Sequence, residues 1–310
     1  MSLQPANTSI LSALLAQLDR IILGKQEMLR HCITCLLAGG HLLLEDVPGV
    51  GKTTLAQALS ASLGLRFSRV QFTADLMPSD LTGVSVYERS KEQFVFHPGP
   101  VFSQVLLADE INRASPKAQS ALLEAMEERQ VSVEGTTYRL PAPFFVIATQ
   151  NPLEQQGTHP LPESQLDRFL MRLSLGYPDR QAEHALLAGS SRRDALRNLQ
   201  PVLDPAGLAQ LQQAVQAVHV SDALIDYLQN LLDATRDGRW FEQGLSPRAG
   251  LAILQAAKAR ALLSGRDYVA PDDVQVILPH TAAHRLVPVS TAGRGAVEQI
   301  HALLRSVPLQ

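Results

Sequence analysis

The fold of this chain is decided by residues 42–56, which read Leu42-Leu43-Leu44-Glu45-Asp46-Val47-Pro48-Gly49-Val50-Gly51-Lys52-Thr53-Thr54-Leu55-Ala56. The three leucines are typical of a buried strand, and the segment with proline and two glycines is typical of a tight loop. A helix is expected over residues 52–62, with Gly64 in the left-handed conformation just beyond its end. The segment therefore predicts a strand, a glycine-rich loop and a helix in direct succession.

This loop has the chemistry of an anion site. Backbone N–H groups of the glycines can turn toward an anion, and the positive end of the following helix points at the same charge. Lys52 adds a cation for β- and γ-phosphates, and Thr53 adds a hydroxyl for Mg²⁺. One departure is Asp46, which stands where this loop usually has a glycine, about six places before the lysine. The predicted nucleotide-binding residues are Asp46, Val47, Pro48, Gly49, Val50, Gly51, Lys52, Thr53 and Thr54.

Two further apolar segments end in polar residues, as fully buried parallel strands do. Residues 105–108 precede Asp109 and Glu110, and residues 144–149 precede Gln150 and Asn151. Successive strand residues point to opposite faces, so Asp109 can hold Mg²⁺ while Glu110 orients or deprotonates an attacking water. Asn151 is expected to hydrogen-bond the γ-phosphate or that water. The three segments together predict a protein that binds a nucleoside triphosphate.

Composition is consistent with a soluble protein of enzyme size. The chain has 310 residues, of which 45% are hydrophobic, and its net charge of −3 gives no sign of an overall nucleic-acid footprint. We expect no membrane span and no secretory leader. The two cysteines, Cys32 and Cys35, form a lone C-x-x-C in a helical pattern and are interpreted as small buried hydrophobic residues. A reducing cytoplasm is the simplest compartment.

Strands and helices alternate as far as residue 178, which indicates an α/β domain with a mainly parallel sheet over residues 1–178. Helices are expected at 9–22, 26–37 and 116–129, the last capped by Ser115, and further strands at 41–45 and 66–72. Period-two alternation predicts hairpins at 83–97, projecting from the body, and at 131–140.

Residues 179–310 show no convincing strand and form a second, all-helical domain. Helices are expected at 182–187, 205–218, 223–235, 247–263 and 271–278. Ser246 caps and Pro247 begins one of them, which places Arg248 in its first turn. A cation there opposes the helix dipole, so either an anion lies beside Arg248 or the side chain is a solvated surface arginine.

The chain resembles the MoxR-type AAA+ ATPases, of the clade with an insertion in helix 2, over nearly its whole length. The resemblance rests on these segments in this order, together with the phosphate loop: Leu23-Gly24-Lys25-Gln26, Gln71-Phe72-Thr73-Ala74-Asp75-Leu76-Met77-Pro78-Ser79-Asp80, Asp109-Glu110-Ile111-Asn112-Arg113-Ala114, Leu122-Leu123-Glu124-Ala125-Met126-Glu127-Glu128, Ala148-Thr149-Gln150-Asn151-Pro152, Leu161-Pro162-Glu163-Ser164-Gln165-Leu166-Asp167-Arg168-Phe169 and Ser246-Pro247-Arg248-Ala249.

The resemblance implies a P-loop NTPase core with helices on both faces of a parallel sheet, followed by a smaller helical lid. It implies ATP or ADP as ligand and Mg²⁺ as cofactor. Arg113 is a weaker candidate for an intersubunit contact. For Arg168 the alternative is a salt bridge within the chain, to Asp167 or Glu163. The implied roles are Walker A for Lys52 and Thr53, Walker B for Asp109 and Glu110, sensor 1 for Asn151, sensor 2 for Arg248, and for Arg168 an arginine finger given to the neighbouring subunit.

The family also implies a homo-oligomeric ring, most simply a hexamer, that remodels or matures partner proteins in a chaperone-like way. Proteins with von Willebrand factor A domains are the implied partners. The main alternative is a nucleic-acid-associated ring motor, and a third reading is a nucleotide-gated binding module with negligible turnover. The Asp109-Glu110 pair argues against the third reading. Against nucleic acid, the positive charges of the hairpins, on Arg89, Lys91 and Arg139, are offset by the negative charges of Glu88, Glu92 and Glu134.

Overall fold

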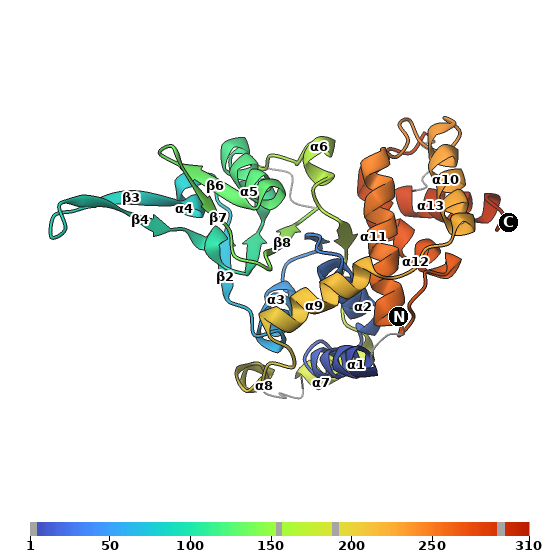
Figure 1. The fold of residues 1–310 in the computed structure, drawn as a ribbon, viewed down its shortest axis with the longest axis horizontal. Helices are drawn as coiled ribbons and strands as arrows, with labels where there is room; N and C mark the ends of the chain where they lie inside the picture. The colour runs from blue at the N-terminus through green and yellow to red at the C-terminus, as the bar shows by residue number, and fades with distance from the viewer. Residues whose placement is uncertain (1–4, 153–156, 188–191, 290–294, 310) are drawn as a thin grey trace.

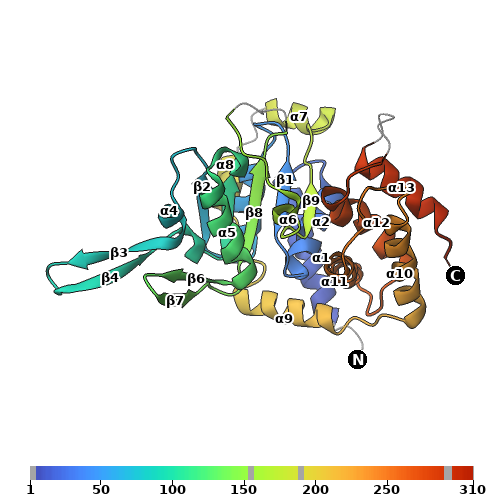
Figure 2. The same cartoon turned by 90° about the horizontal axis from the view of Figure 1, so that it is seen from above.

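A five-stranded parallel sheet forms the centre of the molecule in the computed structural model (Figure 1; Figure 2), which describes residues 5–152, 157–187, 192–289 and 295–309. Its strands lie in the order β2-β5-β8-β1-β9. Their bounds are Leu42–Glu45 for β1, Phe67–Gln71 for β2, Val105–Asp109 for β5, Phe145–Gln150 for β8 and Met171–Leu173 for β9. The α/β class is confirmed, and β9 is a strand that sequence analysis did not predict.

Helices cover both faces of this sheet, because its central strands β5, β8 and β1 are apolar on both sides. Leu42 and Leu44 belong to one buried cluster and Leu43 to the other, as expected for alternating strand residues. The first cluster includes side chains of α1 (Pro5–Asp19), α2 (Gln26–Leu37) and α3 (Lys52–Ser62). The second includes side chains of α4 (Pro78–Thr82) and α5 (Pro116–Glu128).

Every described element after residue 178 is helical, apart from isolated bridges. The longer helices are α7 (Arg180–Leu187), α8 (Arg192–Arg197), α9 (Pro205–Gln216), α10 (Asp222–Arg236), α11 (Pro247–Leu263), α12 (Pro271–Ala282) and α13 (Ala296–Ser306). The first buried cluster runs from α1 and α2 into α11 and α12, so the core is continuous across residues 178 and 179. The boundary between two domains at that point stays a prediction.

Both predicted hairpins are present. Strands β3 (Gly83–Glu88) and β4 (Gln93–Pro98) form an antiparallel pair that projects far from the body in Figures 1 and 2. Strands β6 (Gln130–Val133) and β7 (Thr136–Arg139) form the shorter one. Phe96 of the long hairpin stacks on Tyr138 of the short one, with 4.1 Å between ring centroids. The two hairpins are therefore packed together near their bases.

The sequence predicted α2, α3 and α11 with the bounds observed, and Ser115 and Ser246 accept the predicted capping hydrogen bonds. It missed α4, α6 (Glu163–Leu166), α8, α13 and the 3₁₀ turns η1 (Pro100–Phe102), η2 (Ile111–Arg113) and η3 (Ala283–Arg285). Cys32 and Cys35 are free and fully buried, which confirms their interpretation as core residues, and burial raises the pKa of Cys32 to about 12. Among the described helices, none combines the length and the apolarity needed to cross a membrane.

Candidate active site

The carboxyl ends of β1, β2, β5 and β8 bring the predicted chemistry to one edge of the sheet. Parallel strands deliver their terminal side chains to the same edge, which is where open α/β sheets bind ligands. The residues that line this cleft are Pro48, Gly49, Gly51, Lys52, Thr53, Arg69, Gln71, Asp109, Glu110 and Asn151. Arg69 and Gln71 were not predicted as site residues, although sequence analysis predicted the strand that carries them, at residues 66–72.

The phosphate loop between β1 and α3 leaves room for an anion. Gly49 and Gly51 have φ values of +87° and +102°, and a Cβ built on either would meet no atom within 4 Å. Only glycine adopts such angles at little cost, so the loop keeps its backbone open to the cleft. Lys52 donates from Nζ to the Asp46 carbonyl oxygen at 2.8 Å. Burial lowers the pKa of Lys52, and the nearby carboxylates of Asp46, Asp109 and Glu110 oppose that shift.

Asp109 lies almost fully buried at the end of β5. Its Oδ1 accepts a hydrogen bond from Thr149 Oγ1 at 2.6 Å, and its Oδ2 contacts Arg69 Nη2 at 2.7 Å. Asp109 and Thr53 offer hard oxygen ligands in one cleft, which fits Mg²⁺ because that ion takes one or two protein oxygens beside phosphates and water. Over the described residues there is no group of three or more His, Cys, Asp or Glu side chains that would instead hold a transition metal.

Glu110 adopts a left-handed conformation, with φ of +57°. Its N–H donates to Thr149 Oγ1 at 2.9 Å, which holds the turn in place. Such an angle is uncommon for a non-glycine residue and is retained where the surroundings enforce it, often at active sites. The carboxylate accepts from Gln71 Nε2 at 2.7 Å and contacts Arg113 Nε at 3.0 Å, both through Oε2. Arg113, considered above for an intersubunit contact, therefore pairs within its own chain.

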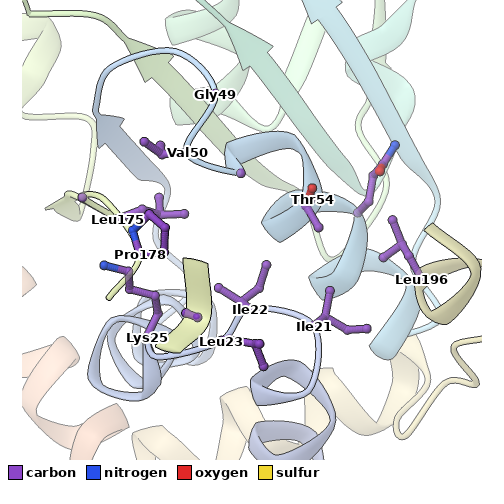
Figure 3. Close-up of a pocket in the computed structure, with 14 residues that line it drawn as sticks. Ile21, Ile22, Leu23, Lys25, Gly49, Val50, Thr54, Leu175, Pro178 and Leu196 are labelled. Carbon is purple, nitrogen blue, oxygen red and sulfur yellow. The ribbon is translucent and has the colours of Figure 1, made fainter. Parts of the chain in front are cut away.

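A second pocket adjoins the phosphate loop (Figure 3). Its volume is about 380 Å³, and it shares Gly49 and Gly51 with the cleft. Ile21, Ile22, Leu23, Lys25, Val50, Thr54, Leu175, Gly176 and Pro178 are among its other lining residues. The mostly apolar walls suit a flat heterocycle. Sequence analysis singled out residues 23–26 by resemblance alone and gave them no role.

Two of the predicted nucleotide residues line neither space. Val47 lines neither the cleft nor the second pocket. The Asp46 side chain turns away from the cleft and accepts hydrogen bonds from the backbone beyond β9. Val50 and Thr54 line the second pocket rather than the cleft. Within residues 46–54, Pro48, Lys52 and Thr53 therefore line only the cleft, and Val50 and Thr54 line only the second pocket. Asp46 has a structural role.

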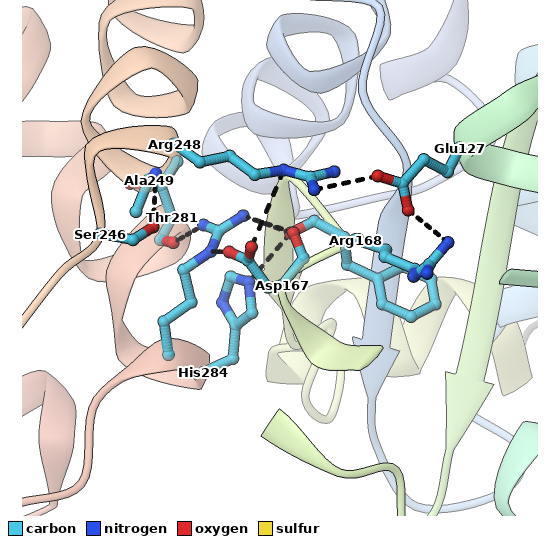
Figure 4. A network of polar contacts seen from close by, with 10 residues as sticks. Glu127, Asp167, Arg168, Ser246, Arg248, Ala249, Thr281 and His284 are labelled. Carbon is cyan, nitrogen blue, oxygen red and sulfur yellow. Dashed lines mark hydrogen bonds and ion pairs between the residues drawn. The ribbon is translucent and has the colours of Figure 1, made fainter. Parts of the chain in front are cut away.

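The two arginines that resemblance implied as catalytic lie together, away from the cleft (Figure 4). Arg168 Nη1 contacts Glu127 Oε2 at 2.5 Å and donates to the Leu123 carbonyl at 2.8 Å. Arg248 Nη1 contacts the other oxygen of the same carboxylate at 3.0 Å. Arg168 thus forms a salt bridge within the chain, but with Glu127 rather than with Asp167 or Glu163. Glu127 is also an anion of the kind expected beside Arg248.

Asp167 ties the same cluster to the turn after α12. Its Oδ1 contacts Arg285 Nε at 2.6 Å, and its Oδ2 lies 3.8 Å from Arg248 Nε. Burial lowers the pKa of Arg285, and the Asp167 carboxylate opposes that shift. His284 Nε2 lies 2.9 Å from the Phe169 carbonyl oxygen. Sequence analysis assigned no role to residues 281–310, and these contacts show how η3 holds the segment that carries Arg168.

Comparison with known families supports the resemblance. Residues 41–171 match the family described as "ATPase family associated with various cellular activities (AAA)", and residues 233–303 match the AAA lid domain. The chain is 42% identical to the chaperone MoxR1 of Mycobacterium tuberculosis over 293 residues, which are 91% of this chain and 77% of that one. It is 32% identical to the MoxR protein of Methylorubrum extorquens over 94% of this chain and 93% of that one.

Further relatives agree. The protein YeaC of Bacillus subtilis, of uncharacterized function, is 47% identical over 90% of this chain and 87% of its own length. The crystal structure of "a putative ATPase" from Cytophaga hutchinsonii superposes with a TM-score of 0.91 at 36% identity, covering 98% of this chain and 96% of that one. The identities extend over both the sheet and the helical region. The chain belongs to the MoxR family of AAA+ ATPases.

Proposed function

We propose that this protein hydrolyses ATP with Mg²⁺ in a homo-oligomeric ring and uses the energy to remodel or mature partner proteins. The observation that carries the proposal is the convergence of Lys52, Thr53, Asp109, Glu110 and Asn151 on one cleft beside an open glycine loop. Phosphoryl transfer needs positioned cations and an oriented water, and this cleft offers Lys52 as a cation and Glu110 and Asn151 to orient a water.

The residues of the cleft divide the reaction between them. Lys52 leaves the Asp46 carbonyl and neutralises charge that develops on the β- and γ-phosphates. Thr53 and Asp109 would hold Mg²⁺, which would supply positive charge to neutralise the phosphate oxygens. Arg69 must then release Asp109, since it now contacts one of that carboxylate's oxygens. Glu110 acts as the base once its carboxylate releases Gln71 and Arg113, and Asn151 orients the water or the γ-phosphate.

We further propose that Arg168 and Arg248 act on the nucleotide of a neighbouring subunit. Both are held by Glu127 and neither lines the cleft of its own chain, among the residues described. Two arginines at one site can stabilise the charge of the transition state when a phosphate replaces the Glu127 carboxylate. This differs from a sensor 2 arginine that folds onto its own nucleotide. A ring, most simply a hexamer, supplies such a neighbour at every cleft.

A protein partner fits the long hairpin better than nucleic acid does. Four apolar side chains are exposed on it: Val84, Val86, Tyr87 and Phe94 are 43%, 46%, 50% and 69% exposed. Tyr87 and Phe94 pair across the strands with 5.4 Å between ring centroids. Exposed apolar clusters on a projecting element mark protein contacts, whereas nucleic-acid contacts need net positive charge. A protein with a von Willebrand factor A domain is the proposed partner.

The test is steady-state ATP hydrolysis with Mg²⁺ and with EDTA, alone and with a purified von Willebrand factor A-domain protein or duplex DNA. The proposal expects Mg²⁺-dependent turnover that the protein partner stimulates and DNA at physiological salt does not. A Tyr87→Ser/Phe94→Ser double variant should keep basal turnover and lose the stimulation. Stimulation by DNA alone would favour a nucleic-acid motor, and turnover absent under every condition would reject the proposed activity.

A further inference from the structure

Asp46 is a buried acid in the phosphate loop that neither the family resemblance nor the cleft explains. The residue is 6% exposed and follows directly after β1. Its carboxylate accepts three hydrogen bonds from one short segment beyond β9. The donors are Ser174 Oγ at 2.7 Å, the Leu175 N–H at 2.6 Å and the Gly176 N–H at 2.9 Å.

The backbone of Asp46 forms hydrogen bonds with two other parts of the site, Lys52 and the end of β8. Its carbonyl oxygen accepts from Lys52 Nζ, and its N–H donates to the Gln150 carbonyl at 3.2 Å, beside Asn151. One residue therefore joins the phosphate-binding lysine, the end of β8 and the segment after β9. Hydrogen bonds to an ionised acceptor are about twice as strong as neutral ones, so this junction is well fixed.

The segment that Asp46 holds is a wall of the second pocket. Leu175, Gly176 and Pro178 line that pocket together with Gly49 and Val50 of the phosphate loop. The Lys25 ammonium, which lines it as well, donates to the Tyr177 carbonyl at 2.7 Å and holds the same segment from its other side. The distance between the phosphate loop and this wall therefore depends on the Asp46 carboxylate.

We infer that Asp46 is a positioning residue that sets the wall against which the nucleotide base binds, and that it does not bind phosphate through its side chain. This inference rests on the proposed function, because it assumes that a nucleotide spans the cleft and the second pocket. A glycine at this position, as in the usual phosphate loop, keeps the backbone contacts but removes the link to residues 174–176.

Asp46→Asn tests the inference with little change of shape. An amide has one acceptor oxygen, and whichever way it turns, its NH₂ group faces a backbone N–H, of either Leu175 or Gly176. We expect the affinity for ATP to fall about tenfold, since a hydrogen bond to a charged group is lost. Affinity for inorganic tripolyphosphate, which has no base, should change by less than about twofold, because the phosphate loop keeps its backbone contacts. Asp46→Gly should show the same pattern.

Isothermal titration of the wild type and variants with both ligands gives the answer. Ser174→Ala removes one exposed donor and should weaken ATP alone by about threefold, even if Asp46→Asn folds poorly. Glu45→Gln makes the same chemical change one residue earlier and should leave the ratio of the two affinities unaltered, since Glu45 contacts Gln150 and Arg172 instead.

Equal losses for ATP and tripolyphosphate in Asp46→Asn and in Ser174→Ala would overturn the inference, because they would place the effect on the phosphate loop. Unchanged affinities for both ligands would also overturn it. A wild-type protein that binds neither ligand would reject the proposed function itself, and that outcome is separate because it needs no variant.

Discussion

The cleft and the arginine cluster carry the two halves of the proposed chemistry, and they are built in different ways. Asp109 ends β5, Asn151 follows β8, and Lys52 follows the loop after β1. These three strands are neighbours in a parallel sheet, so one edge of the sheet brings the three residues together. Arg168 and Arg248 come from a turn and from a helix of the second half of the chain. They meet at Glu127, on a third element, where the two guanidinium groups share one carboxylate.

One subunit therefore holds the nucleotide-binding groups in its own cleft, whereas Arg168 and Arg248 lie outside that cleft. Strand geometry fixes the first, since neighbouring strands keep their register over buried apolar side chains. Ion pairs between partly exposed side chains fix the second, and such pairs are weak enough to exchange partners. We therefore expect binding of nucleotide to be a property of the subunit, and hydrolysis to be a property of the assembly.

The largest effect should come from Arg168→Ala. An arginine that stabilises the transition state in trans contributes about 10³-fold or more to the rate of phosphoryl transfer. Turnover at high protein concentration should fall by that factor, while ATP affinity measured by titration stays near that of the wild type. Arg172→Ala removes an arginine of β9 that pairs with Glu45 and is the matched control. Loss of ATP affinity in Arg168→Ala would mean that Arg168 serves its own cleft.

A smaller loss is expected for Glu110→Gln, which removes the base and leaves the binding groups intact. General-base catalysis contributes about 10²-fold or more, so turnover should fall by that factor. ATP should stay bound to an assembled ring, as shown by light scattering with labelled nucleotide. Turnover close to that of the wild type would remove Glu110 from the mechanism and leave Asn151 or Gln71 to orient the water.

The smallest effect concerns Glu127, whose carboxylate competes with phosphate for both arginines. In Glu127→Gln that competition is weaker, and an exposed ion pair is worth a factor of about two to five in an equilibrium. The protein concentration that gives half-maximal specific activity should fall by about that factor. Glu128→Gln changes an exposed neighbour on α5 and is the control. A rise in that concentration would show that Glu127 orients the arginines instead of competing for them.

Sequence patterns predicted the cleft because its residues follow recognisable strands and because parallel strands share an edge. Arg69 and Gln71 also lie at the end of a parallel strand, but β2 has exposed side chains and its apolar pattern is weaker. Their contacts with Asp109 and Glu110 form only because β2 lies beside β5. Glu127 was quoted only as part of a family segment. Its contacts join residues 41 and 121 positions apart in sequence, and no periodicity reports a pairing between distant elements.

Asp46, in the phosphate loop, is a second residue whose contacts with distant residues could not be predicted from the sequence. The spacing rule marks it as a departure, but its purpose depends on residues 174–176, which pack beside β1 only after β9 joins the sheet. The strand β9 itself has three residues and carried no pattern that distinguished it from a loop.

The most direct test of shared active sites is to mix Arg168→Ala with Glu110→Gln before assembly and to measure ATP hydrolysis at high protein concentration. Where a cleft of the Arg168→Ala variant lies beside a Glu110→Gln subunit, the cleft keeps its own Glu110 and receives the intact Arg168 of its neighbour. With random mixing in a ring, about a quarter of the interfaces are of this kind, so the mixture should regain about a quarter of wild-type turnover. Turnover no greater than the mean of the two variants alone would contradict the account, because each cleft would then depend on its own arginine.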